Sequence, residues 1–271
     1  MTLHYQDEWL SIYAGDCRAV MADMPADSVD CVVTSPPYWQ LRDYGHPDQL
    51  GMELTPELYV AAMVDAFREV RRVMKPTASL WLNLGDSFAA SGKGGGGNRG
   101  DRKNWRSIAG RSGWRSPPPG YKPKDLTLVP FQVAMALRQD GWYLRQVIVW
   151  RKPAAVEPTR LDRPATSHEY VYLLAKSEHY AARDPGMAWW GHTVWDIVSD
   201  SDSSHHAIMP TELARRCILA GSQPGHLILD PFAGSGTVGR AAQQLSRRAV
   251  LVDLNPELAG ASQTPLGLEV A

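Results

Sequence analysis

The stretch 226–245 constrains the fold more than any other part of the chain. It contains the apolar run Leu227–Leu229, continues with the octapeptide DPFAGSGT from Asp230 to Thr237, and then takes on a helical pattern. Glycines at a strand-to-helix junction let the backbone turn tightly and approach a ligand closely. In a doubly wound α/β sheet, ligands bind at the carboxyl ends of the strands. The stretch therefore predicts a strand–loop–helix unit of such a sheet, with a ligand at its loop.

Strand and helix patterns alternate along most of the chain. This alternation is typical of an α/β protein with a doubly wound, mostly parallel, Rossmann-like sheet, expected here as one domain over residues 1–271. The pair Thr55-Pro56 predicts the start of the longest helix, and Pro76 predicts its end. The predicted strands are 9–14, 29–34, 79–84, 143–150, 170–175, 226–230 and 249–253. The predicted helices are 18–24, 55–75, 126–139, 210–220 and 237–245.

Composition excludes several classes of protein. Of 271 residues, 44% are hydrophobic and 21% are charged, which is close to globular averages and excludes wholesale disorder. No run approaches the roughly 18 apolar residues that a membrane helix needs. The N-terminal sequence MTLHYQDEWLS has no basic or apolar leader, so no secretion signal is expected. The three cysteines, Cys17, Cys31 and Cys217, lie far apart and predict free thiols in a reducing cytoplasm.

A second motif, TSPPY at positions 34–38, directly follows a predicted strand. Its two prolines fix φ and lack N–H groups, so the turn is rigid. The turn presents the Ser35 hydroxyl and the Pro36 carbonyl as hydrogen-bond acceptors, and Tyr38 adds an aromatic face. This set suits a flipped nucleobase that carries an exocyclic amine. Accepting hydrogen bonds from the amine lets its nitrogen become more tetrahedral and attack a methyl sulfonium, without a metal, a cysteine nucleophile or a histidine base.

The loop at 230–237 taken alone fits a nucleoside cofactor and does not separate a nicotinamide dinucleotide from S-adenosyl-L-methionine. Gly234, Gly236 and Gly239 satisfy the dinucleotide pattern GxGxxG, and Asp253 ends the next predicted strand, where a carboxylate can accept hydrogen bonds from a ribose. A nicotinamide-dependent dehydrogenase is therefore one hypothesis, but it leaves the motif at 34–38 unexplained. A nucleic-acid-binding protein without catalysis is another, and the complete SPPY motif argues against it.

Charge is distributed unevenly along the chain. The net charge is −1, yet residues 91–124 contain nine basic residues and one acidic residue. This segment has a net charge of +8, so the remainder carries −9. A block of this size predicts a surface that contacts a polyanion, with a solvated loop as the other interpretation.

Together the two motifs resemble those of the bacterial and phage DNA amino-methyltransferases that use S-adenosyl-L-methionine. In that family a (Asp/Ser/Asn)-Pro-Pro-(Tyr/Phe) turn is catalytic and a Phe-x-Gly-x-Gly loop binds the cofactor. The catalytic motif comes first in this chain, so the resemblance is to the permuted β arrangement, and it covers most of the sequence. It implies transfer of a methyl group to an exocyclic amine of duplex DNA at specific sites.

The resemblance assigns roles residue by residue. The catalytic residues are Ser35, Pro36, Pro37 and Tyr38. The cofactor-binding residues are Asp16, Thr34, Pro210, Thr211, Asp230, Phe232, Gly234, Ser235, Gly236, Thr237 and Asp253. Within this set Asp16 belongs near the adenine, Pro210 near the methionine end and Asp253 at the ribose. Ser-Pro-Pro-Tyr is commoner among the cytosine-N4 enzymes of the family, so the N4 amine of cytosine is expected, with the N6 amine of adenine as the alternative.

A DNA methyltransferase needs a segment that recognises its target sequence. The Gly- and Arg-rich insert 86–124 is the first candidate, because arginine can bond guanine edges and lysine can hold phosphates. The second candidate is 177–204, although its residues Trp189, Trp190 and Trp195 are expected in the core. The residues expected to contact DNA are Arg99, Arg102, Lys103, Arg106, Arg111 and Arg115.

The resemblance also implies partners and a place of action. Duplex DNA is the expected substrate, RNA is a weaker alternative, and no membrane partner is expected. A homodimer and a cognate restriction endonuclease are common in the family, and this sequence fixes neither. The expected location is the cytoplasm of a bacterial or phage-infected cell, at the nucleoid. No metal site is predicted, because the histidines His168, His179, His192 and His205 lack metal-ligand spacing.

Overall fold

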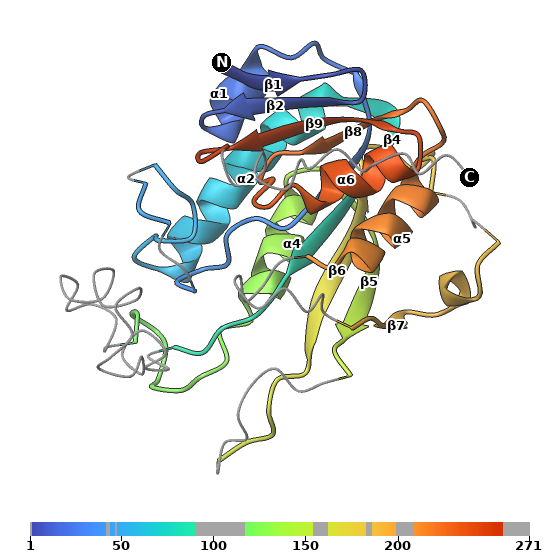
Figure 1. Ribbon diagram of the computed structural model, residues 1–271. Coiled ribbons are helices and arrows are strands. Elements are labelled where there is room, and N and C mark those ends of the chain that lie inside the picture. The colour runs from blue at the N-terminus through green and yellow to red at the C-terminus, as the bar shows by residue number, and fades with distance from the viewer. Residues whose placement is uncertain are drawn as a thin grey trace, which may run out of the picture.

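The fold is built on a nine-stranded sheet with helices on both faces, shown in the computed structural model in Figure 1. The structure describes residues 2–41, 44–46, 48–89, 117–153, 162–182, 186–198 and 209–256. The strands are β1 (Thr2–Gln6), β2 (Leu10–Ala14), β3 (Val29–Thr34), β4 (Met74–Leu84), β5 (Tyr143–Arg151), β6 (His168–Ala175), β7 (Val194–Asp196), β8 (Leu227–Asp230) and β9 (Arg248–Asp253). The helices are α1 (Cys17–Ala22), α2 (Pro56–Val73), α4 (Val129–Gln139), α5 (Thr211–Gly221), α6 (Thr237–Gln244) and the short 3-10 helix η2 (Ala188–Gly191).

The sheet is mixed and mostly parallel. Its strand order is β1-β2-β9-β8-β3-β4-β6-β5-β7. Strands β2, β9, β8, β3 and β4 form a continuous parallel block, and β7 runs parallel to β5. Strand β6 is antiparallel to both of its neighbours, and β1 is antiparallel to β2. The doubly wound, mostly parallel α/β fold predicted from the sequence is confirmed.

Two hydrophobic layers hold the helices against the sheet. In Figure 1, α5 and α6 lie in front of the sheet, and α2 and α4 lie behind it. Successive residues of a strand point to opposite faces, so β4 contributes to both layers. Leu80 and Leu82 pack in the cluster that contains α2 and α4, whereas Trp81 packs in the cluster that contains α5 and α6.

Helix α2 follows directly from its sequence pattern. The Thr55 hydroxyl accepts a hydrogen bond from the Leu58 N–H at 3.3 Å, which caps the helix as predicted. Tyr59, Met63 and Phe67 recur every four residues and are completely buried. Each such side chain contributes about 1.5–3 kcal/mol through burial. The helix ends at Val73, before Pro76, which confirms the predicted end.

Three strands differ from the sequence prediction. Strand β1 was not predicted, because all five of its residues are exposed and show no buried face. Strand β7 was not predicted either, because it is only three residues long. Strand β4 begins at Met74 rather than at 79, and Pro76 lies where its register with β3 shifts. At such an irregularity a proline leaves no ladder hydrogen bond unmade.

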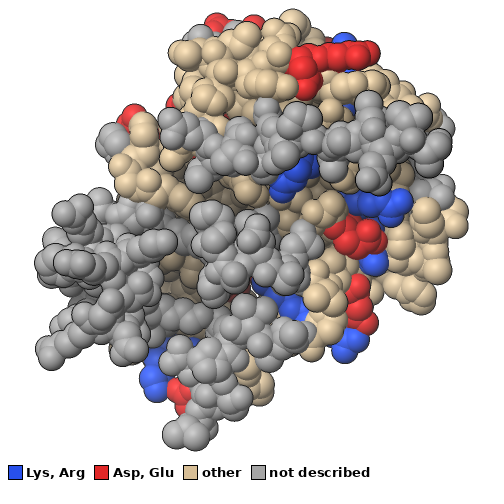
Figure 2. All heavy atoms as spheres, in the orientation of Figure 1, with Lys and Arg blue, Asp and Glu red and all other residues tan. Residues whose placement is uncertain are grey.

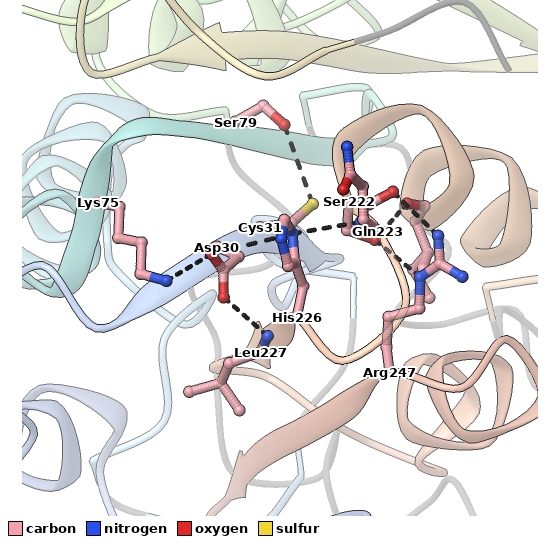
Figure 3. Close-up of polar contacts among 10 residues, drawn as sticks. Asp30, Cys31, Lys75, Ser79, Ser222, Gln223, His226, Leu227 and Arg247 are labelled. Carbon is pink, nitrogen blue, oxygen red and sulfur yellow. Dashed lines mark hydrogen bonds and ion pairs between the residues drawn. The ribbon is translucent and has the colours of Figure 1, made fainter.

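A polar cluster ties together three neighbouring strands at the edge where β3 and β8 begin (Figure 3). Asp30 on β3 accepts a hydrogen bond from the Leu227 N–H of β8 at 2.9 Å. Its other oxygen forms an ion pair with Lys75 of β4 at 2.6 Å. Nearby, the buried guanidinium of Arg247 donates to the Ser222 carbonyl at 2.9 Å. These contacts lie at the edge opposite the carboxyl ends of the parallel strands, so we regard them as structural.

We expect Asp30→Ala to lower the free energy of unfolding by about 1–3 kcal/mol, because it leaves the Leu227 N–H without its acceptor. Urea denaturation measures this change. Glu178→Ala is the control, since the Glu178 side chain is 70% exposed, and it should leave the midpoint unchanged. An unchanged midpoint in Asp30→Ala would contradict the structural role.

Candidate active site

The two sequence motifs meet at one edge of the sheet. Thr34 ends β3, Asp230 ends β8 and Asp253 ends β9, and these three parallel strands are direct neighbours. The Gly15-Asp16 pair follows β2, the next strand in the same parallel block. Segments almost 200 residues apart in the sequence are therefore joined at the carboxyl ends of the strands.

A short hydrogen bond links the turn at 34–38 to the loop at 230–237. The Thr34 hydroxyl donates to Asp230 Oδ1 at 2.6 Å, and the Phe232 N–H donates to the same oxygen at 3.1 Å. Asp230 is 3% exposed, and this burial raises the pKa of its carboxyl to about 7. The two hydrogen bonds lower the pKa and so offset part of the effect of burial. The pair fixes the relative position of the two motifs.

The raised pKa of Asp230 makes stability depend on pH. Because the folded pKa is about 7 and the ordinary value is 3.8, folding favours the protonated carboxyl. The contribution of Asp230 to stability should therefore fall as pH rises from 3.8 to about 7 and then level off. Asp230→Asn keeps an acceptor for Thr34 and cannot ionise, so its melting temperature should exceed the wild-type value above about pH 7 and approach it in acid. If the melting temperatures of the two proteins differ by the same amount at every pH in this range, the raised pKa of Asp230 is contradicted.

The turn at 34–38 is fixed by packing from several directions. Pro36 is buried, and the Pro37 carbonyl accepts a hydrogen bond from the Tyr59 hydroxyl of α2 at 2.9 Å. Gly51 has φ +94°, and a Cβ there would lie 3.1 Å from the Tyr38 carbonyl oxygen. Among the described residues, no N–H or O–H donates to the Pro36 carbonyl. The acceptors predicted for a substrate amine, Ser35 Oγ and the Pro36 carbonyl, therefore lie on a rigid turn.

The Tyr38 hydroxyl is the centre of a polar cluster that the sequence did not predict. It donates to Glu169 Oε2 at 2.6 Å, lies 3.1 Å from Asn83 Oδ1, and accepts from Ser35 Oγ at 3.2 Å. Lys152 forms an ion pair with the other oxygen of Glu169. Burial, followed by the negative charge of Glu169, raises the pKa of Tyr38 well above its usual range, so the phenol stays protonated.

The fold brings these partners together through antiparallel pairing. Glu169 lies at the start of β6, and Asn83 lies near the end of β4, whose neighbour is β6. Lys152 follows the last residue of β5, on the other side of β6. The signal that could have revealed them is a carboxylate and an amide at the ends of apolar strand runs, but only the strand order places them beside Tyr38.

The loop at 230–237 has the predicted glycine geometry. Gly234 and Gly236 adopt positive φ values of +50° and +76°, and Gly236 caps α6. A Cβ at Gly234 would meet no atom within 4 Å, so the loop has open space beside its backbone. Asp253 accepts hydrogen bonds from the Gly234 N–H and the Asn255 N–H, both at 2.8 Å. Burial raises the pKa of the Asp253 carboxyl above its usual range.

The remaining predicted cofactor residues have the following positions. Asp16 caps α1 and forms an ion pair with Arg18 at 2.6 Å. Pro210 and Thr211 begin α5, which packs against β3 and α6. Phe232 packs against Phe67 of α2, with ring centroids 6.4 Å apart. Ser235 and Thr237 lie in the loop, with their hydroxyl oxygens 3.2 Å apart.

The residues predicted to contact DNA are not among those that the structure describes. Arg99, Arg102, Lys103, Arg106, Arg111 and Arg115 lie outside the described residues. Of the insert 86–124, the structure describes 86–89 and 117–124, and of 177–204 it describes 177–182 and 186–198. On the face in Figure 2, described basic side chains lie beside acidic ones rather than in one continuous patch.

The tryptophans of the segment 177–204 belong to the core, as expected. Trp195 is 2% exposed and stacks against Trp81, with ring centroids 6.3 Å apart. Trp189 and Trp190 are half-buried and pack against the same cluster. The three cysteines are free and buried. In the described part of the chain, no helix is long and apolar enough to cross a membrane.

Comparisons with known proteins agree with this geometry. A family model described as DNA methylase matches residues 29–264. The Type II methyltransferase M.SmaI of Serratia marcescens is 44% identical over 92% of this chain and 87% of its own length. The Type II methyltransferase M.Cfr9I of Citrobacter freundii is 43% identical over 91% of this chain and 84% of its own length.

Two solved structures share the fold. PvuII DNA methyltransferase (cytosine-N4-specific) superposes with a TM-score of 0.73 over 100% of this chain and 91% of its own, at 19% identity. A putative DNA modification methylase from Thermus thermophilus, in complex with S-adenosyl-L-methionine, gives 0.64 over 92% of this chain and 89% of its own, at 26% identity. The chain belongs to the DNA methylase family of N6 and N4 amino-methyltransferases, as the sequence motifs predicted.

Proposed function

We propose that this protein transfers a methyl group from S-adenosyl-L-methionine to the N4 amine of a cytosine flipped out of duplex DNA. The observation that carries the proposal is the junction of the two motifs through Thr34 and Asp230 at the carboxyl ends of β3 and β8. This junction puts a rigid amine-accepting turn beside a nucleoside-binding loop. A dehydrogenase would have no use for the turn.

The residues present fit S-adenosyl-L-methionine. The open space beside Gly234 allows close approach of a ligand, Asp16 and Asp253 supply carboxylates around it, and the buried Asp230 holds the loop through Thr34 and Phe232. Carboxylates suit a cofactor that carries a sulfonium, an ammonium and ribose hydroxyls. Asp253 would hold the ribose, Asp16 would lie near the adenine, and Pro210 and Thr211 would lie near the methionine end. The bound cofactor supplies an electrophilic methyl group.

The chain's own residues then prepare the target base. Ser35 Oγ and the Pro36 carbonyl accept hydrogen bonds from the exocyclic amine, which localises its lone pair on nitrogen. The Tyr38 ring stacks on the flipped base, a contact worth about 1–3 kcal/mol. Pro37 keeps the turn rigid through its carbonyl bond to Tyr59. The resemblance of Ser-Pro-Pro-Tyr to cytosine-N4 enzymes supports cytosine over adenine as the target.

Duplex DNA is the proposed substrate because of the basic segment 91–124. If its side chains neutralise phosphates, log Kd should change linearly with log salt concentration, with a slope of about 0.9 per contact. We expect Arg102→Ala/Arg106→Ala to reduce this slope by about 2. Fluorescence anisotropy with a labelled duplex measures it. A flat salt response in the wild type would show that the segment does not contact phosphates.

The Type II methyltransferase relatives support a role in restriction–modification alongside a cognate endonuclease. We propose that the protein acts in the cytoplasm, at the nucleoid. A homodimer is the proposed oligomeric state. Size-exclusion chromatography with light scattering tests it by measuring the molar mass in solution.

The substrate class is tested by transfer of labelled methyl groups from S-adenosyl-L-methionine. The acceptors are unmethylated genomic DNA as duplex, the same DNA as single strands, and RNA transcribed from it. We expect label chiefly in the duplex. Label in RNA alone would overturn the DNA assignment, and cofactor binding without label in any acceptor would indicate a binding protein.

A further inference from the structure

A chain of hydrogen bonds leads from the catalytic turn to a carboxylate that no motif contains. Ser35 Oγ donates to the Tyr38 hydroxyl at 3.2 Å, and that hydroxyl donates to Glu169 Oε2 at 2.6 Å. Asn83 Nδ2 donates to the same oxygen of Glu169 at 3.2 Å. The chain therefore begins at the hydroxyl expected to accept hydrogen bonds from the substrate amine and ends on the carboxyl group of Glu169, which Lys152 also contacts.

Methyl transfer to an amine creates a proton that must leave. The amine lone pair forms the new C–N bond, and the electrons of the broken C–S bond remain on the sulfur of the product. The nitrogen then carries a positive charge and one N–H proton in excess. An acceptor in hydrogen-bond contact removes this proton without requiring water inside the closed site.

We propose that this proton passes through Ser35 and Tyr38 to Glu169. The amine proton moves to Ser35 Oγ, the Ser35 hydroxyl proton moves to the Tyr38 oxygen, and the Tyr38 proton moves to Glu169 Oε2. The methylated amine becomes neutral, Ser35 and Tyr38 each recover a proton, and Glu169 becomes a neutral acid. The inference rests on the proposed methyl transfer. Glu169 touches neither substrate nor cofactor in this scheme, so it acts through Tyr38 as a positioning and proton-accepting residue.

The surroundings of Glu169 suit a relay with one fixed geometry. The side chains of Glu169 and Lys152 are 12% and 14% exposed, so their ion pair is largely shielded from water. Lys152 binds Oε1, so the cation does not occupy Oε2, which accepts hydrogen bonds from Tyr38 and Asn83 and can take the proton. A Cβ at Gly85 would lie 2.7 Å from Tyr38 Cε2 and 3.3 Å from Glu169 Cδ, so glycine there lets Tyr38 and Glu169 lie close together.

The other groups near Glu169 do not compete for the proton. Lys152 is a cation and has no acceptor lone pair. Asn83 Nδ2 donates to Glu169 and to the Tyr170 carbonyl, both at 3.2 Å, and Asn83 Oδ1, 3.1 Å from the Tyr38 hydroxyl, is an amide oxygen and too weak a base to keep a proton. His168, the preceding residue, interacts with the Tyr170 hydroxyl at 3.0 Å. Because burial keeps Tyr38 protonated, its hydroxyl can pass one proton on while receiving another.

Two substitutions interrupt the relay at different points. Tyr38→Phe keeps the ring and removes the hydroxyl, and Glu169→Gln keeps the shape and removes the proton acceptor. We expect each to lower the single-turnover rate of methyl transfer about tenfold, which is below the usual range of about 10²–10⁴ for acid–base catalysis because the methylated nitrogen is itself a strong acid. Glu169→Gln/Lys152→Met guards against misfolding, since it leaves no unpaired buried cation. Glu178→Gln, on an exposed side chain, is the charge-matched control.

The pH profile separates a relay from simple support of the ring. The wild-type single-turnover rate should fall in acid, because the relay needs an unprotonated acceptor at its end, and this acid limb should be absent in Glu169→Gln and in Tyr38→Phe. The double variant Tyr38→Phe/Glu169→Gln should be no slower than the slower single variant, because both interrupt one chain. An unchanged acid limb in the variants, or fully additive losses, would overturn the relay.

Two further measurements do not depend on turnover. Calorimetry should give the same cofactor Kd for wild type and both variants. In the cofactor-free protein, a far-downfield proton NMR signal of the Tyr38 hydroxyl should vanish in Tyr38→Phe and shift in Glu169→Gln. No such signal in the wild type would contradict the Tyr38–Glu169 bond. If the wild type makes no methylated cytosine, the proposed function fails; if it does and both variants match its rate, only the relay fails.

Discussion

Replacing Tyr38 with alanine should lower the single-turnover rate of methyl transfer about 10³-fold and leave the Kd for S-adenosyl-L-methionine within about twofold of the wild-type value. The substitution removes base stacking, worth about 1–3 kcal/mol, together with the hydroxyl that contacts Glu169. It leaves Asp253 and the Gly234 loop intact, so the cofactor site should be unaffected. Rapid-quench kinetics and isothermal calorimetry provide the two measurements.

The matched control is Tyr38→Phe, which retains the ring. Its loss should be about tenfold, so the difference between the two variants isolates stacking from the hydroxyl. Lost cofactor affinity in Tyr38→Ala with normal transfer at saturating cofactor would place Tyr38 in the cofactor site instead of the base site. Equal rates for alanine and phenylalanine would show that the ring does not stack on the base.

Replacing Asp253 with alanine should mainly weaken cofactor binding, in contrast to Tyr38→Ala, and should raise the Kd for the cofactor about 10²-fold. The carboxylate is expected to accept hydrogen bonds from the ribose, and bonds to a charged group are worth about 1.5–3 kcal/mol. It also accepts from the Gly234 N–H at 2.8 Å, so its loss loosens the loop. Transfer at saturating cofactor should fall much less than affinity does.

Asp253→Asn is the companion variant. Its side-chain oxygen can still accept from the Gly234 N–H, so the loop should remain in place while the charge is lost. We expect an affinity between those of the wild type and Asp253→Ala. Calorimetry that finds all three proteins equal would move the ribose contact to another residue.

Local signals in the sequence predicted the parts of the site that lie within single segments. The strand–glycine–helix pattern at 227–245 and the rigid turn at 34–38 each form from residues close in the chain, so composition and spacing specify them. The alternation of strands and helices predicted a mostly parallel sheet, and the strand order in the structure brings Thr34 and Asp230 together.

The Glu169 cluster could not be predicted in the same way. Its position depends on β6 entering the sheet antiparallel beside β4, with Leu84 opposite Tyr170. That register comes from long-range packing, and neither Glu169 nor Asn83 lies in a recognisable motif. Strand β1 was missed for another reason, because a fully exposed edge strand has no alternating apolar pattern. The DNA contacts predicted at 99–115 lie outside the described residues and stay predictions.

The central claim is that the Ser-Pro-Pro-Tyr turn directs a methyl group to the N4 amine of cytosine in DNA. The most direct measurement incubates unmethylated mixed-sequence duplex DNA with the protein and S-adenosyl-L-methionine, digests the DNA to nucleosides, and identifies them by mass spectrometry. We predict N4-methylcytosine, present with the wild type and strongly reduced with Tyr38→Ala. N6-methyladenine in its place would contradict the target base, and no methylated nucleoside despite cofactor binding would contradict the account as a whole.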